Sequence, residues 1–154
     1  MVGSYFGQKV EFAGYKFDSV KERDFFATFI QDRVEHYTVH ESFKLQDTFE
    51  LDNGLKMRGI SYAPDFCVYD DKGKLQHVYD IKASFNSTYG VDAAASIRFK
   101  WFAKQYGIPV EVVVPRTYDF RVKCMGITKK TVPIIKQDTD YNVWDALEEM
   151  VAKK

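Results

Sequence analysis

The sequence has few cysteines and no long apolar run, and each absence argues against a class of protein. Its two cysteines, Cys67 and Cys124, lie outside any C-x-x-C motif and outside any cluster with histidine. This disfavours a zinc site, so we expect two free thiols in an intracellular protein. No run approaches the ~20 apolar residues that span a bilayer, and residues 1–9 lack the apolar stretch of a signal peptide. We therefore expect a cytoplasmic protein with no membrane contact.

The chain also has no net charge, since 22 basic residues balance 22 acidic ones. At first this argues against a nucleic-acid partner. The distribution is uneven, however, because nine basic and two acidic residues lie between positions 96 and 136, a local excess of seven positive charges. Such a stretch predicts a basic face that follows phosphates. The alternative is a solvated surface on which both signs mix in three dimensions, and the sequence does not decide between them.

What the sequence does contain is typical of one globular α/β domain. Its 154 residues fit a single domain, 1–154, that needs neither disulfides nor a structural metal. Aromatic residues make up 16% of the chain, which favours a β-rich core. The order of helix, hairpin, strand, helix and strand predicts a mixed central sheet covered by helices.

Local signals mark where several of these elements begin and end. Ser19 and Glu22 fit a capping box that opens a helix, whose apolar residues continue at helical spacing to Tyr37. Asn53 followed by Gly54 predicts a hairpin turn between two alternating strands.

A second helix and a buried strand are predicted in the second half of the chain. Asp92 caps a helix that runs to about residue 106 and ends at Gly107. The β-branched run 110–114 predicts a buried strand, and residues 138–152 predict a short acidic helix.

The residues that carry chemistry lie on two neighbouring predicted strands. Pro64-Asp65 is followed, after the turn at 70–74, by Asp80-Ile81-Lys82. Side chains two apart on a strand face the same side, so Asp80 and Lys82 point together, and a hairpin brings Asp65 beside them. Two carboxylates and an ammonium suit metal-assisted phosphodiester hydrolysis. The alternative is an exposed hairpin with an Asp–Lys surface pair worth under ~1 kcal/mol.

These residues resemble the motif of the PD-(D/E)xK nuclease superfamily. The stretch 14–22, with its G-x-x-F-D-S-x-x-E pattern, and the blocks around Asp65 and Asp80 resemble a phage-encoded endonuclease-like family. TnsA-type transposase subunits and RecU-type junction resolvases share this plan. The resemblance covers roughly residues 8–115 and leaves 116–154 as an unexplained C-terminal extension.

The resemblance implies a restriction-endonuclease-like α/β/α core and a Mg²⁺-dependent DNA endonuclease, with Mn²⁺ able to substitute. The metal ligands would be Asp65, Asp80 and Glu22, and Lys82 would be the catalytic lysine. Glu22 is equally explained as a helix cap. The implied role is in phage DNA metabolism in the host cytoplasm, on branched or recombination intermediates, as a homodimer or with a transposase-like partner protein.

Four further residues are candidates for DNA contact, namely Arg98, Lys100, Lys104 and Ser84. Each has a plain alternative as part of a solvated helix face or a surface loop. The histidines at positions 36, 40 and 77 lack a metal-ligand spacing, so no metal role is expected of them. A rival function is a non-catalytic DNA-binding or assembly subunit on the same fold, which would not need Lys82.

Overall fold

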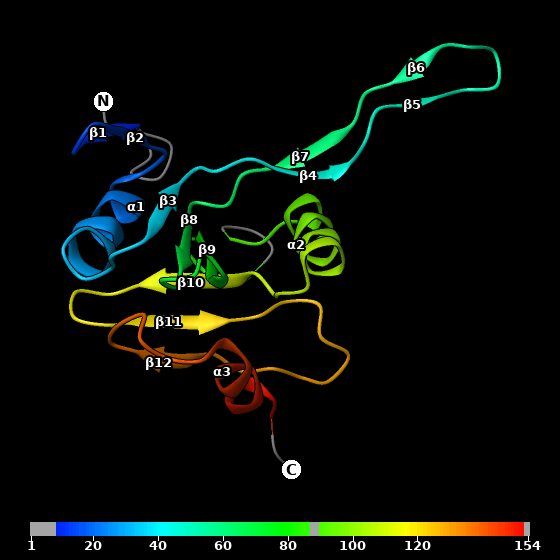
Figure 1. Cartoon of the computed structure of the whole chain (residues 1–154). Coiled ribbons are helices and arrows are strands. Elements are labelled where there is room, and N and C mark those ends of the chain that lie inside the picture. The colour runs from blue at the N-terminus through cyan, green and yellow to red at the C-terminus, as the bar shows by residue number, and fades with distance from the viewer. Residues whose placement is uncertain (1–8, 87–89, 153–154) are drawn as a thin grey trace, which may run out of the picture.

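A computed structural model describes residues 9–86 and 90–152 and shows a six-stranded sheet at the centre of the chain (Figure 1). From one edge to the other, the strands are β12 (Ile134–Lys136), β11 (Phe120–Lys123), β10 (Glu111–Pro115), β9 (Leu75–Ile81), β8 (Phe66–Tyr69) and β3 (Tyr37–Val39). β9 and β10 pair in parallel, and the other neighbours pair antiparallel. The predicted mixed central sheet is therefore confirmed.

Helices cover both faces of this sheet. One face packs against α1 (Val20–Phe25), the π-helical turn η1 (Phe26–Ile30) and α3 (Val143–Met150) in an aromatic core that includes Phe25, Phe66, Tyr79 and Phe120. The opposite face packs mainly against α2 (Ala93–Tyr106). The arrangement is an α/β/α sandwich, as expected for the fold class. No helix in the described ranges combines the length and apolar character needed to cross a membrane.

The predicted start and end of α2 and the predicted hairpin turn, each set by a few consecutive residues, are confirmed. The side chain of Asp92 accepts a hydrogen bond from the Ala95 amide at 2.8 Å, and Gly107 ends α2 with a φ of 73°. Gly54 closes the predicted hairpin with a φ of 89°. Both cysteines are free, as expected, and the structure shows that both are buried.

The first helix is shorter than its apolar spacing predicts. α1 leads directly into η1, in which the Gln31 amide donates to the Phe26 carbonyl at 2.8 Å, five residues back. Tyr37, expected on this helix, instead opens β3 and pairs with Val68 of β8. Spacing alone misassigned Tyr37, because a half-buried position on an edge strand and one on a helix face look alike in sequence.

Before α1, the chain forms a hairpin of β1 (Val10–Phe12) and β2 (Tyr15–Phe17). The C-terminal residues after 116 add β11 and β12 to the central sheet and place α3 against it. They thus extend the same core that the earlier strands begin.

A long ribbon of two strands projects from the body, and we call residues 43–62 the arm (Figure 1). At its base, β4 (Phe43–Gln46) pairs with β7 (Ile60–Tyr62), and further out β5 (Phe49–Glu50) pairs with β6 (Lys56–Met57). α2 holds the base, since the Phe43 ring packs edge-on against Phe102, with ring centroids 5.0 Å apart. The strands approach closely at Gly59, where a Cβ atom would lie 2.4 Å from the Gln46 carbonyl oxygen.

Candidate active site

A cavity of about 550 Å³ opens between the start of α1, the base of the arm and the end of β9. Its polar lining includes Glu22, Asp65, Asp80, Lys82 and Arg98. These residues come from four separate segments of the chain. The site motif of the sequence and the residue at the start of the first helix therefore meet in one place.

The β8–β9 hairpin brings the sequence motif together as predicted. Phe66 pairs with Tyr79 across the two strands, which sets Asp65 beside the end of β9. The Ile81 amide donates to Asp65 Oδ2 at 2.6 Å, and Lys82 Nζ lies 3.2 Å from Asp80 Oδ1. Both carboxylates are largely buried, so this is not the exposed surface pair that the alternative required.

Glu22 reaches the cavity from the first turn of α1. The Ser19 side chain caps this helix by accepting a hydrogen bond from the Glu22 amide at 3.1 Å. This is the first half of the predicted capping box. The buried Glu22 carboxylate itself turns toward the strands, where its Oε1 lies 2.6 Å from Nε2 of His40. Ser19 therefore caps the helix, whereas the Glu22 side chain lines the cavity.

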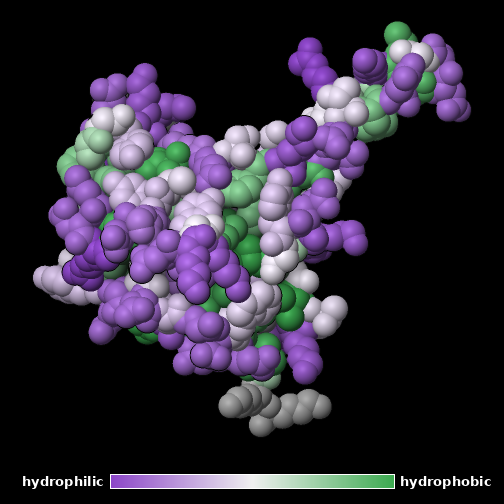
Figure 2. All heavy atoms as spheres, in the orientation of Figure 1, coloured by the Kyte–Doolittle hydropathy of each residue, from purple (hydrophilic) through white to green (hydrophobic). Residues whose placement is uncertain are grey.

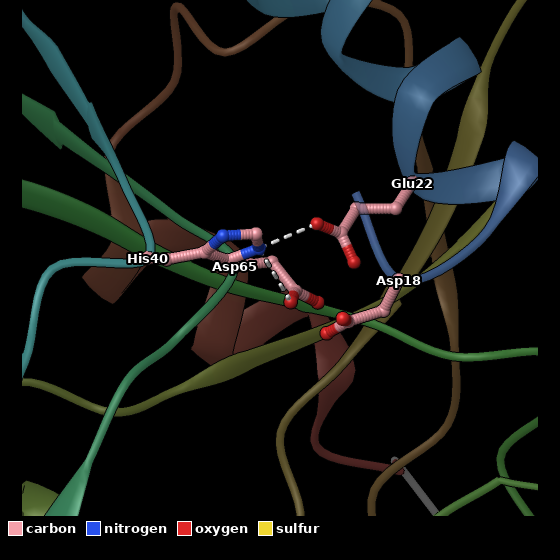
Figure 3. Close-up of side chains that lie close together, drawn as sticks. All are labelled: Asp18, Glu22, His40 and Asp65. Carbon is pink, nitrogen blue, oxygen red and sulfur yellow. Dashed lines mark hydrogen bonds and ion pairs between the residues drawn. The ribbon is translucent and has the colours of Figure 1, made fainter. Parts of the chain in front are cut away.

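Sequence reasoning missed two residues that join this group, Asp18 and His40. Asp18, Glu22, His40 and Asp65 each offer a ligand atom, and these atoms lie within 4.8 Å of one another. Figure 3 shows the polar ends of these four side chains converging. Asp18 lies just before α1 and Glu22 in its first turn, whereas His40 follows β3 and Asp65 precedes β8. Asp18 stands four residues before Glu22, a helix-like spacing that offers a weak sequence signal.

His40 comes to the site through strand pairing rather than through sequence spacing. β3 and β8 pair with Val39 opposite Phe66, so the next position along each strand sets His40 opposite Asp65. The His40 amide donates to the Asp65 carbonyl at 3.1 Å, and His40 adopts a φ of 55°. The structure thus places His40 in a candidate ligand group that its spacing in the sequence did not predict.

Three largely buried acidic side chains, Glu22, Asp65 and Asp80, lie close together at the cavity. Burial, and then the carboxylates of Asp80 and Glu22, raise the pKa of Asp65 well above its ordinary value. The hydrogen bond to Glu22 raises the pKa of His40, against the opposing effect of burial. Carboxylates that repel one another at close range are stabilised when a cation lies between them.

The donor set of Asp18, Glu22, His40 and Asp65 fits a divalent cation. Three carboxylates supply the hard oxygen ligands that Mg²⁺ and Mn²⁺ accept, and an imidazole suits Mn²⁺ and later transition metals better than Mg²⁺. Asp80, a predicted ligand, is not one of these four residues. Its Oδ2 accepts a hydrogen bond from the Tyr62 hydroxyl at 2.5 Å, and its Oδ1 faces Lys82.

Of the four residues predicted to contact DNA, Arg98 lines the cavity. Lys100 and Lys104 are exposed on α2 outside the cavity lining, and the Lys100 stem lies against Gly126. Ser84 also lies outside the lining, and its hydroxyl accepts a hydrogen bond from the Asn86 amide at 3.1 Å.

Comparison with known proteins sets these residues within a recognised domain. One family model matches residues 3–116 of the 154, a stretch that contains every residue lining the cavity and ends before β11. No curated protein and no solved structure matches the chain. On the strength of that match the chain belongs to the family described as protein of unknown function, DUF1064.

Proposed function

We propose that the chain is a divalent-metal-dependent endonuclease that hydrolyses phosphodiester bonds in DNA. The observation that carries the proposal is the convergence of Glu22, Asp65, Asp80 and Lys82 in one cavity. The resemblance of the sequence to PD-(D/E)xK nucleases supports the same assignment for the same residues.

Within this proposal, Asp65 and Glu22 hold the metal, with Asp18 and His40 completing the set of ligands near it. When bound, the cation polarises a phosphoryl oxygen and lowers the pKa of a bound water. Because the set contains an imidazole, we expect Mn²⁺ to support activity at least as well as Mg²⁺.

Two basic side chains of the cavity, Lys82 and Arg98, act on the phosphate group of the substrate. The Lys82 ammonium lies beside Asp80 and is about one-quarter exposed, so it faces both the carboxylate and the open space of the cavity. There it stabilises negative charge that develops on the phosphoryl group, or holds the attacking water. Arg98 enters from α2 and offers a guanidinium to a neighbouring phosphate oxygen.

The test is a cleavage panel on the full chain. Wild type, Lys82→Ala and Lys72→Ala are incubated with linear duplex, four-way junction, flap and single-stranded DNA, in Mg²⁺, Mn²⁺ or EDTA. Lys72 is a matched control because it is an exposed lysine outside the cavity lining. We expect metal-dependent cleavage of at least one substrate by wild type and Lys72→Ala, and none by Lys82→Ala.

A second outcome would favour the rival function. If wild type binds DNA but cuts no substrate with any metal, the chain is better described as a DNA-binding or assembly subunit. Measuring Mn²⁺ binding by calorimetry then tests whether the cavity holds a metal ion, independently of cleavage.

A further inference from the structure

The outer part of the arm has one apolar face and one charged face. In the register of β5 and β6, Phe49 lies opposite Met57, and Glu50 lies opposite Lys56. The Leu51 amide donates to the Leu55 carbonyl at 2.7 Å, which continues the same pairing toward the turn. Cross-strand partners share a face, and faces alternate along a strand. Phe49, Leu51, Leu55 and Met57 therefore form a single apolar face.

This apolar face is open to solvent. Its four side chains have exposed fractions between 42% and 64%, and Figure 2 shows hydrophobic side chains at the far end of the arm, away from the body. A two-stranded ribbon is marginally stable alone in water. Aromatic side chains bury ~150–250 Å² each, and Leu and Met lie near the low end of this range, so at these exposed fractions the face offers on the order of 300–400 Å². Patches of that size often mark interaction sites.

Charge on the arm points to a protein rather than to nucleic acid. Residues 47–58 contain three acidic side chains, Asp47, Glu50 and Asp52, and two basic ones, Lys56 and Arg58. A phosphate backbone selects an excess of basic residues, which the arm lacks. An apolar face with a nearly balanced charged back is instead suited to an apolar protein surface.

The chain itself carries an apolar surface of the required kind. A groove between β12 and α3 is lined by Val132, Pro133, Ile134, Ile135 and Val151, with Glu149 and Ala152 at its side. Ile135 is 55% exposed. In Figure 1, β12 and α3, whose residues line this groove, lie at the end of the molecule opposite the arm, so the groove is out of reach of the arm of the same chain.

The area favours a second copy over an unrelated partner. One arm face seated on one groove removes roughly 600–800 Å² counted over both surfaces, below the ~1,200 Å² at which stable interfaces begin. Two chains related by a two-fold axis make this contact twice, which brings the total to about 1,200–1,600 Å². Because arm and groove lie at opposite ends, two chains side by side and antiparallel can each reach the groove of the other.

We propose that two copies of the chain form a dimer by exchanging arms, with the apolar face of each arm seated in the β12–α3 groove of the other copy. The inference does not rest on the proposed nuclease activity. It adds a structural consequence, because β7 leads from the arm directly to Tyr62 and Ala63 in the cavity lining. Each arm therefore connects the proposed dimer interface to the candidate active site of its own chain.

The test measures the mass of the full chain in solution by sedimentation velocity. We expect wild type to be a dimer. The double variant Leu51→Ser/Leu55→Ser is expected to be a monomer with an unchanged far-UV spectrum. Its matched control is Glu50→Ser/Lys56→Ser, which alters the neighbouring cross-strand pair on the opposite face of the arm and is expected to remain a dimer. Ile135→Ser alters the groove at an exposed position and is expected to weaken the dimer.

Cross-linking tests the exchange directly. The native cysteines are buried, so Leu55→Cys and Ile135→Cys each add one accessible thiol. On oxidation, a mixture of the two variants should form a disulfide-linked pair faster than either variant alone. A monomeric wild type, or a dimer that survives the arm variant, overturns the proposal. Loss of the dimer in the arm variant, with no effect of Ile135→Ser and no mixed cross-link, overturns the assignment of the groove.

Discussion

Replacing Tyr62 by phenylalanine tests how the cavity holds Asp80. The Tyr62 ring packs against Phe99 and Phe102, with centroids 5.9 and 5.8 Å away, and its hydroxyl donates to Asp80 Oδ2. Burial, and then the charge of Asp80, raise the pKa of Tyr62 well above its ordinary value, so the phenol remains a donor. Phenylalanine keeps the ring contacts and removes only this hydrogen bond.

The loss has a stability component and a functional component. A hydrogen bond to a charged group contributes ~1.5–3 kcal/mol, and Asp80 retains its contact with Lys82. We therefore expect Tyr62→Phe to lower the free energy of unfolding by about 2 kcal/mol, equivalent to a Tm lower by roughly 4–8 °C at this chain length. With Asp80 free to rotate, the Lys82 ammonium is no longer held in one position in the cavity. We therefore expect DNA cleavage to fall ~10–100-fold, a loss similar in size to that seen when hydrogen bonds that orient metal ligands are removed.

Tyr69→Phe provides the matched control. The Tyr69 hydroxyl donates to Glu41 Oε1 at the same distance of 2.5 Å, and neither residue lines the cavity. Urea unfolding and the cleavage assay are run on both variants without and with Mn²⁺. Tyr69→Phe should lose stability and retain cleavage. If both variants lose the same fraction of cleavage, the positioning role of Tyr62 is wrong. If Tyr62→Phe is as stable as wild type, the hydrogen bond itself is not formed in solution.

Two further predictions concern groups outside the cavity. Asp92→Ala removes the N-cap that accepts the Ala95 amide, and we expect it to cost about 1 kcal/mol in urea unfolding; an unchanged midpoint would show that α2 does not need this cap. Amides of the turn at 70–74 lower the pKa of Asp70 below 3.8. A carboxyl group whose pKa is lower in the folded chain than in the unfolded chain stabilises the fold at pH values above its unfolded pKa, and this stabilisation is lost as the pH falls through its folded pKa. We therefore expect the free energy of unfolding of Asp70→Asn to depend less on pH below 3.8 than that of wild type. The same pH dependence in both proteins would contradict the assignment.

The parts of the fold that sequence predicted are those specified by neighbours along the chain. The turn at Gly54, the cap at Asp92 and the stop at Gly107 each depend on a few consecutive residues, and the structure places all three as expected. The end of the first helix depends instead on which surface the next segment meets. Tyr37 pairs with β8, a strand about 30 positions later, and no local pattern encodes that contact.

The same distinction holds within the site. Asp65, Asp80 and Lys82 lie on one hairpin, so alternation and a turn signal were sufficient to bring them together. His40 reaches Asp65 only because β3 pairs with the far side of β8. Its ring could be identified only after the strand order was known. Without related sequences to compare, histidine at position 40 looks like any polar residue near the end of a strand.

A second buried cluster of ionisable groups shows what separates a site from a structural network. On the opposite face of β9 from Asp80, His77 Nδ1 lies 2.6 Å from Glu111 Oε2, and Glu111 Oε1 accepts the Tyr141 hydroxyl at 2.5 Å. The remaining His77 nitrogen, Nε2, donates to the Tyr141 carbonyl at 2.8 Å, and both His77 and Glu111 are fully enclosed.

Each polar atom of the His77–Glu111 pair thus has a partner within the protein, and no solvent or ligand can approach it. The network fixes the segment before α3 to the sheet, which is sufficient reason for its charges to be buried. The group around Asp65 differs, because its carboxylates gather beside one another at the wall of a cavity. Carboxylates that raise the pKa of a neighbouring carboxyl group, beside a cavity that a cation can enter, are a stronger indication of function than burial or charge alone.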